Sequence, residues 1–146
     1  MKKYTFWLKT AAVFQLITAF VHLLSFFFRP PPNNDTERQL FDLIQSYKFD
    51  FGAGFHRSMG DLTTGLSICF CLVCLLGGLM NLHLLRKKVE SDVMRGVINI
   101  NLLVFGMCFA GMLIFTFLPP IVLTGLIFVS LIMARITISN QTAIAD

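Results

Sequence analysis

The chain has 146 residues, of which 55% are hydrophobic and only 14% are charged. A soluble domain of this size needs more polar side chains to cover its surface, so the composition indicates a single domain in contact with the lipid bilayer. The net charge is +4, but the sequence shows no soluble surface on which basic and aromatic residues alternate. Nucleic acid is therefore not an expected partner.

Four segments of the chain are apolar enough to span a membrane. Crossing about 30 Å of hydrocarbon takes roughly 20 apolar residues in a helix. The segments lie at about residues 8–28, 61–85, 97–118 and 121–137, and the last needs Arg135 to extend toward the headgroups. The sequence therefore predicts an all-α fold over residues 1–146, a four-transmembrane-helix antiparallel bundle.

The distribution of positive charges predicts the orientation of this bundle. Eight Lys and Arg residues lie on one side of the predicted spans and four on the other, and the richer side is expected to be cytoplasmic. The N-terminus and the C-terminus are then both cytoplasmic. The first span is expected to be a retained helix rather than a cleaved secretory signal, because Gln15, Thr18 and His22 interrupt its apolar run.

The outer loop between the first two spans predicts a further helix. The sequence RPPPNND is typical of a rigid turn, and Asn34 or Asp35 then begins a segment, about residues 35–48, with its apolar side chains on one side. We expect a short amphipathic helix that lies on the outer membrane surface or caps the bundle. The glycines of FDFGAGF are expected to bend the chain into the second span.

Polar side chains form a stripe along the first span. They are Gln15, Thr18, His22, Ser25 and Arg29, spaced alternately three and four residues apart. This spacing keeps them within about 80° of the helix circumference. Because lipid penalises each polar group that faces it, the stripe is expected to face the bundle interior.

The start of the second span offers a polar surface at a similar depth. It carries His56, Arg57, Asp61 and Thr64, and Ser58 with Asp61 has the spacing of a capping box, which would leave Arg57 just outside the helix. We predict a polar chamber between the first two spans that opens outward beneath the amphipathic helix. The same side chains could instead only fix helix packing, and the sequence leaves both interpretations open.

The predicted chamber defines the candidate ligand-binding residues. They are Gln15, Thr18, His22, Ser25, Arg29, His56, Arg57, Asp61 and Thr64. No catalytic residue is assigned, because no nucleophile has a recognisable triad around it. Haem and metal ions are not expected, because the histidines are not placed as an opposed pair and no metal-ligand spacing is present.

The remaining polar and small residues of the spans are expected to serve packing. The four cysteines lie at membrane depth and spread around their helices, so they are expected to be small packing residues: Cys69, Cys71, Cys74 and Cys108. Asn99 and Asn101 lie on nearly opposite sides of the third span, so at most one faces the interior. Four glycines are expected to allow close helix contact: Gly77, Gly78, Gly106 and Gly111.

Several short motifs occur in an order that resembles a known family. They are the histidine of the first span, TERQ (Thr36–Gln39), KFDFG (Lys48–Gly52), RSMGD (Arg57–Asp61) with Gly65 beyond it, and PPIVL (Pro119–Leu123). Over about residues 10–135 the chain resembles small, uncharacterised bacterial four-helix integral membrane proteins of the DoxX-like group. The resemblance implies a multi-pass protein of the bacterial cytoplasmic (inner) membrane. It transfers no catalytic residues. Some relatives in the wider group are similar to small subunits of quinone-linked redox enzymes, which suggests a quinone or lipid-like ligand.

Two functions of different classes follow from the sequence. The first is a small non-catalytic integral membrane protein. It is either an accessory subunit, whose partners are other membrane subunits or a second copy of the chain, or a binder of a small amphiphile (lipid or quinone-like) in the outward chamber. The second is a membrane-embedded redox or proton-transfer component, in which His22 exchanges protons and Asp61 tunes it. The absence of a recognisable catalytic motif favours the first, and the sequence does not decide whether the protein is an enzyme.

Overall fold

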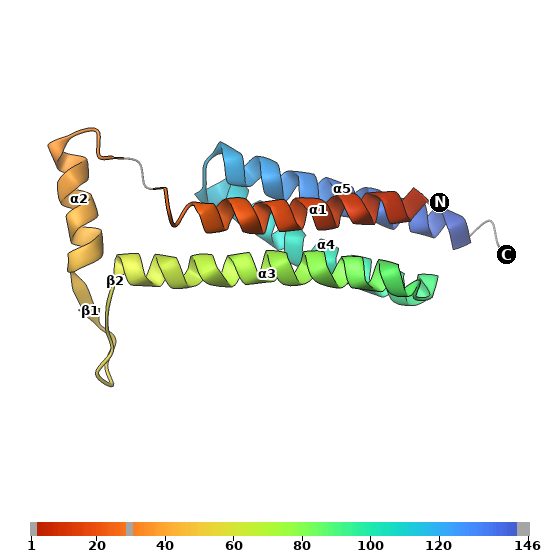
Figure 1. Cartoon of the computed structure of the whole chain (residues 1–146), viewed down its shortest axis with the longest axis horizontal. Coiled ribbons are helices and arrows are strands. Elements are labelled where there is room, and N and C mark those ends of the chain that lie inside the picture. The colour runs from red at the N-terminus through yellow and green to blue at the C-terminus, as the bar shows by residue number, and fades with distance from the viewer. Residues whose placement is uncertain (1–2, 29–30, 143–146) are drawn as a thin grey trace.

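The computed structural model describes residues 3–28 and 31–142, in which helices dominate (Figure 1). The helices are α1 (Lys3–Leu24), α2 (Asp35–Ser46), α3 (Met59–Lys87), α4 (Ser91–Phe115) and α5 (Leu118–Thr142). The strands β1 (Lys48–Asp50) and β2 (His56–Ser58) pair antiparallel between α2 and α3. The predicted all-α class therefore holds, apart from a small β-hairpin that the sequence interpretation did not include.

Four of these helices are long and apolar enough to cross a membrane: α1, α3, α4 and α5. This is the arrangement of a multi-pass membrane protein. The helices extend beyond the predicted spans at several ends, and α4 begins at Ser91 rather than near residue 97. Hydropathy marks only the apolar part of a helix, whereas charged and polar residues at its ends are also good helix formers.

Helix α1 is shorter than predicted at its C-terminal end. The helix ends at Leu24 rather than near residue 28, and the next residues form a turn. The Ser25 hydroxyl donates a hydrogen bond of 2.6 Å to the His22 carbonyl, and the Ser25 backbone N–H also lies 3.2 Å from this carbonyl. Such local bonding competes with the regular helical pattern and ends the helix.

The first and last helices form the centre of the bundle. α1 packs along both α3 and α5, and α4 packs along α5. Fully buried side chains fill the space between the helices: Leu8, Ile98, Ile127, Leu131 and Ile138. Contacts between α3 and α4 are sparse over the part of the chain that the structure describes, so these two helices flank the central pair.

Glycines bring α3 close to α1, as the sequence predicted for two of them. A Cβ atom on Gly77 would lie 2.8 Å from Gln15 Nε2, and one on Gly78 would lie 3.1 Å from the backbone oxygen of Ala12. Gly106 similarly faces the ring of Phe128. Gly111 has no such neighbour within 4 Å and does not mark a close contact between described residues.

Helix α2 and the hairpin lie at the end of the bundle where α1 ends and α3 begins (Figure 1). Both run across the direction of the long helices. The Asn34 side chain caps α2 by accepting a hydrogen bond of 2.9 Å from the Glu37 backbone N–H, as the sequence predicted. The long helices thus reach an end covered by a transverse helix.

The hairpin turn explains the glycines of FDFGAGF. Gly52, Ala53 and Gly54 have φ values of 79°, 51° and 80°. Glycine adopts such values without steric cost, which is why two of the three turn positions are glycine. The Asp50 carboxylate also accepts a hydrogen bond of 2.8 Å from the Gly52 N–H. The predicted bend is therefore a tight reversal between two strands.

Candidate functional site

The polar stripe of α1 divides into an inner and an outer part. Gln15 and Thr18 are 0% and 3% exposed and face the bundle interior, as predicted. His22 is half-buried and Ser25 is exposed. The fifth residue of the stripe, Arg29, lies outside the described residues. The two parts of the stripe therefore have different surroundings.

The inner part belongs to a buried amide cluster, which we define as Gln15, Asn81 and Asn101. Gln15 Nε2 donates to Asn101 Oδ1 at 3.2 Å, and Asn81 Nδ2 donates to Gln15 Oε1 at 3.0 Å. Asn81 Nδ2 also donates to Asn101 Oδ1 at 3.3 Å, and Asn101 Nδ2 donates to Asn81 Oδ1 at 3.4 Å. The cluster connects α1, α3 and α4 at a depth where lipid offers no alternative partner.

The amide cluster leaves little capacity for a ligand. Asn101 Nδ2 also donates to the Val97 carbonyl at 3.0 Å, so the amide groups are turned toward one another and toward their own backbone. Thr18 likewise donates to the Phe14 carbonyl at 2.7 Å. Gln15 therefore contributes to helix packing. Sequence reasoning missed Asn81, although it is a polar residue within an apolar span.

The outer part of the stripe borders a cavity beneath α2. This outer cavity has a volume of about 370 Å³. Its lining comes from the turn after α1 and from two helices: Ser25 and Phe26 of the turn, Phe41, Ile44 and Gln45 of α2, and Gly60, Thr63, Thr64 and Ser67 of α3. It lies between the C-terminal end of α1 and the N-terminal end of α3, under α2. Two predicted residues line it, Ser25 and Thr64.

The lining of the outer cavity combines hydroxyl and amide groups with aromatic carbon. The Thr64 hydroxyl donates to the Gly60 carbonyl at 2.7 Å, and the Thr63 hydroxyl donates to the Met59 carbonyl at 3.0 Å. A hydroxyl that donates once still has acceptor capacity. The cavity can therefore accept hydrogen bonds from a polar group while Phe26 and Phe41 contact an apolar one.

A separate apolar groove runs along α1 and α3 beside the outer cavity. Its volume is about 360 Å³, and its lining includes Leu16, Ala19, Leu23, Ile68 and Leu72. Phe26 borders both the outer cavity and the groove. The outer cavity and the apolar groove thus share one lining side chain.

His22 borders a separate cavity on the other side of α1. This cavity of about 220 Å³ is lined by residues of α1, α3 and the start of α5, including Phe70, Pro119 and Pro120. The centroid of the His22 ring lies 5.2 Å from that of Phe70 and 6.2 Å from that of Phe26. Within residues 3–28 and 31–142 no group forms a hydrogen bond or ion pair with its imidazole. Ser25 borders both this cavity and the outer cavity.

The three ionisable residues before and at the start of α3 lie elsewhere. His56 and Arg57 are exposed on β2, so Arg57 precedes the helix as the capping-box interpretation predicted. Asp61 accepts a hydrogen bond of 3.0 Å from the Ser58 N–H, and Ser58 Oγ accepts one of 3.1 Å from the Asp61 N–H. Asp61 is exposed, borders none of the cavities described above and is not brought to His22. Its carboxylate is used to begin α3.

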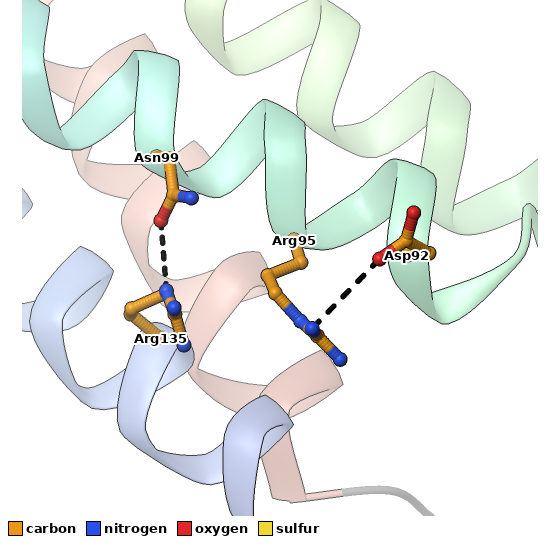
Figure 2. A network of polar contacts seen from close by, with 4 residues as sticks. All are labelled: Asp92, Arg95, Asn99 and Arg135. Carbon is orange, nitrogen blue, oxygen red and sulfur yellow. Dashed lines mark hydrogen bonds and ion pairs between the residues drawn. The ribbon is translucent and has the colours of Figure 1, made fainter. Parts of the chain in front are cut away.

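The opposite end of the bundle carries a second set of polar contacts (Figure 2). Arg135 of α5 donates from Nε to Asn99 Oδ1 of α4 at 2.7 Å. Arg95 Nη1 lies 3.8 Å from the Asp92 carboxylate on the same helix. Asn99 therefore faces α5 while Asn101 faces the amide cluster, in agreement with their predicted opposite sides. Arg135 thereby has a side-chain partner in α4.

The cysteines do not form a metal site with other residues in the described ranges. Cys74 is buried, Cys71 and Cys108 are half-buried, and Cys69 is exposed, all as free thiols. The thiol of Cys71 lies 3.5 Å from the Ala19 carbonyl of α1. In residues 3–28 and 31–142, no three His, Cys, Asp or Glu side chains are grouped closely enough to hold a metal ion.

Comparisons of the chain with protein-family models, with curated proteins and with solved structures find no match.

Proposed function

We propose that this protein is a non-catalytic membrane component that binds a small amphiphile, lipid or quinone-like, at the outer end of its helix bundle. The observation that carries the proposal is the outer cavity of about 370 Å³ beneath α2, which shares Phe26 in its lining with the apolar groove. A molecule with a polar head and a flexible hydrocarbon tail matches this pair of spaces. The head lies among the hydroxyls under α2, and the tail follows the groove between α1 and α3.

The chemistry of the lining supports an uncharged or weakly polar head. Among the described residues, the polar groups at the outer cavity are hydroxyls and the Gln45 amide, and none of the lining side chains is Lys, Arg, Asp or Glu. Such groups orient a ligand through hydrogen bonds while most of its surface contacts carbon. The family resemblance of the sequence to DoxX-like proteins is compatible with this ligand class and with a place beside other membrane subunits or a second copy of the chain.

The proposed function includes an orientation in the membrane. We place the four long helices as an antiparallel bundle with both termini in the cytoplasm of a bacterium, and α2 on the outer face of the cytoplasmic membrane. The excess of Lys and Arg at the termini and in the α3–α4 connection supports this orientation. The amphiphile then enters from the outer leaflet.

A second candidate function is a redox or proton-transfer component in which His22 acts on the ligand. The observation that favours it is the His22 imidazole in an aromatic cavity, without a hydrogen-bond partner among the described residues, where it could donate a hydrogen bond to a quinone carbonyl. The partnership with Asp61 that the sequence suggested lacks support, because the Asp61 carboxylate is bonded to Ser58. We therefore favour binding over catalysis.

The outer cavity can be tested with a bulky side chain inside it. Ser67→Phe should fill part of the space beneath α2 and lower the amount of co-purified amphiphile about tenfold, equivalent to about 1.4 kcal/mol of binding free energy. The measurement is mass spectrometry of small molecules extracted from protein purified in mild detergent.

The matched control for this experiment is Leu66→Phe. Leu66 is the neighbouring residue of α3 and is 72% exposed, so the same ring there points away from the bundle. Equal amounts of ligand in both variants, or no ligand in the unaltered protein, would contradict the proposal.

The proposed orientation predicts on which side of the membrane the C-terminal end of α5 and the hairpin turn lie. A reporter that is active only in the cytoplasm should be active when fused after residue 142, and a reporter that is active only outside should be active when inserted in the turn at Ala53. The reverse pattern would show that α2 and the outer cavity lie on the cytoplasmic side.

A further inference from the structure

Aromatic side chains occupy alternate positions from the end of α2 through β1. Tyr47, Phe49 and Phe51 are spaced two residues apart, and such residues lie on the same face of a strand. The ring centroids of Tyr47 and Phe49 are 5.0 Å apart, and those of Phe49 and Phe51 are 6.2 Å apart. The three rings therefore form a continuous row.

The second strand extends the same face. Phe49 pairs directly with Arg57, and the Phe51 N–H donates to the Phe55 carbonyl at 3.0 Å. Directly paired residues on antiparallel strands project to the same side. We define the aromatic face of the hairpin as Tyr47, Phe49, Phe51, Phe55 and Arg57. The other face carries Lys48, Asp50 and His56.

The aromatic face has no cover within the described chain. Tyr47, Phe51 and Phe55 are 57–58% exposed and Phe49 is 39% exposed. Exposed aromatic surface of this kind marks an interaction site. β2 packs against α2 and α3, which hold the hairpin in place, so a contact outside the chain is expected for the aromatic face rather than for the hairpin as a whole.

The place of the hairpin in the fold indicates what this contact is. Figure 1 shows it beside the first turn of α3, projecting sideways from the bundle. Because α3 is a candidate membrane span that begins at Met59, this level corresponds to the boundary of the bilayer. Tyrosine and other aromatic residues favour this boundary, and a guanidinium beside them pairs with lipid phosphates.

We propose that the aromatic face of the hairpin docks onto the phospholipid headgroup layer of the membrane that the bundle spans. The rings lie among the glycerol and upper acyl groups, Arg57 contacts phosphate, and the face with Lys48, Asp50 and His56 stays in water. This docking holds α2 flat over the bundle. It requires no ligand in the outer cavity and is independent of the function proposed above.

Tryptophan fluorescence in lipid nanodiscs tests the docking. Trp7 is the only tryptophan of the chain, so Trp7→Phe gives a silent background for Phe51→Trp. In nanodiscs that contain phosphatidylcholine brominated at shallow acyl carbons, the new indole should lose more fluorescence than with bromine at deep carbons. Its emission should be shifted to the blue, and iodide in the buffer should quench it little.

His56→Trp in the same background is the matched control, because His56 lies on the other face of the same hairpin. Its indole should be quenched by iodide and little by brominated lipid. Phe55→Trp repeats the test at a second position if Phe51→Trp does not fold. Iodide quenching without bromine quenching at residues 51 and 55, or equal bromine quenching at residues 55 and 56, would overturn the proposal. The first of these results would show that the aromatic face stays in water.

Discussion

Replacing Asn101 by leucine should lower the free energy of unfolding by about 2 to 3 kcal/mol, because buried hydrogen-bonding groups left without a partner cost about 1–3 kcal/mol. Asn101 Oδ1 accepts hydrogen bonds from both Gln15 and Asn81, and Asn101 is 4% exposed. Asn101→Leu leaves both donors inside the bundle. The measurement is reversible unfolding in mixed micelles, followed by circular dichroism.

Two further variants show whether the loss comes from the amide cluster. Asn99 lies on the same helix as Asn101 but makes an exposed hydrogen bond to Arg135 of α5. Asn99→Leu removes only this bond and should lower the free energy of unfolding much less. The triple variant Gln15→Leu, Asn81→Leu, Asn101→Leu removes all three amides, so that no amide of the cluster is left without a partner. It should recover part of the stability that Asn101→Leu loses. If the triple variant lost the sum of three single losses, the cluster would not act as a unit.

Gly78→Val should also destabilise the bundle, by about 2 to 3 kcal/mol, because it overpacks a close helix contact. The Cβ atom alone would lie 2.9 Å from Leu16 Cδ2 and 3.1 Å from the Ala12 carbonyl oxygen. The leucine can change rotamer, but the backbone oxygen moves only if α1 and α3 separate. The same unfolding measurement checks this, and ligand retention should fall in parallel because the apolar groove lies between these two helices.

Gly65→Ala is the control for the glycine effect. Gly65 lies on the same helix with nothing within 4 Å of an added Cβ atom. Alanine in a helix interior is favoured over glycine by about 0.5–1 kcal/mol, so this variant should be slightly more stable than the parent. Equal destabilisation by both substitutions would show that the close approach at Gly78 contributes nothing specific.

The coarse fold could be predicted because it depends on local composition. Long apolar runs predict long apolar helices, and Asn34 marks the start of α2 through a cap that spans only three residues. The hairpin was missed because its strands are three residues long, too short for a periodic signal. The glycine-rich turn predicts a bend. The alternation of Tyr47, Phe49 and Phe51 is a strand signal that the sequence prediction did not include.

The site was harder to predict because it depends on how helices rotate about their axes. Gln15, Asn81 and Asn101 are far apart in the sequence, and no local pattern reveals that they meet. Of the residues predicted to line a chamber between the first two spans, Ser25 and Thr64 border the cavity beneath α2, whereas Gln15 and Thr18 are buried inside the bundle. The sequence groups Asp61 with His22 because both lie on polar helix faces at similar depth, whereas the capping box holds Asp61 at the exposed start of α3.

The central position of α1 has a consequence for biogenesis. Of the four long helices, α1 leaves the ribosome before the others, and α5, which is made after them, is one of its two main neighbours. The side of α1 that packs on α5 must therefore remain against lipid, or against the insertion machinery, until residues 118–142 have been synthesised. Assembly of the core is completed only when α5 is present, and a chain that stops before Leu118 lacks the partner around which the bundle closes.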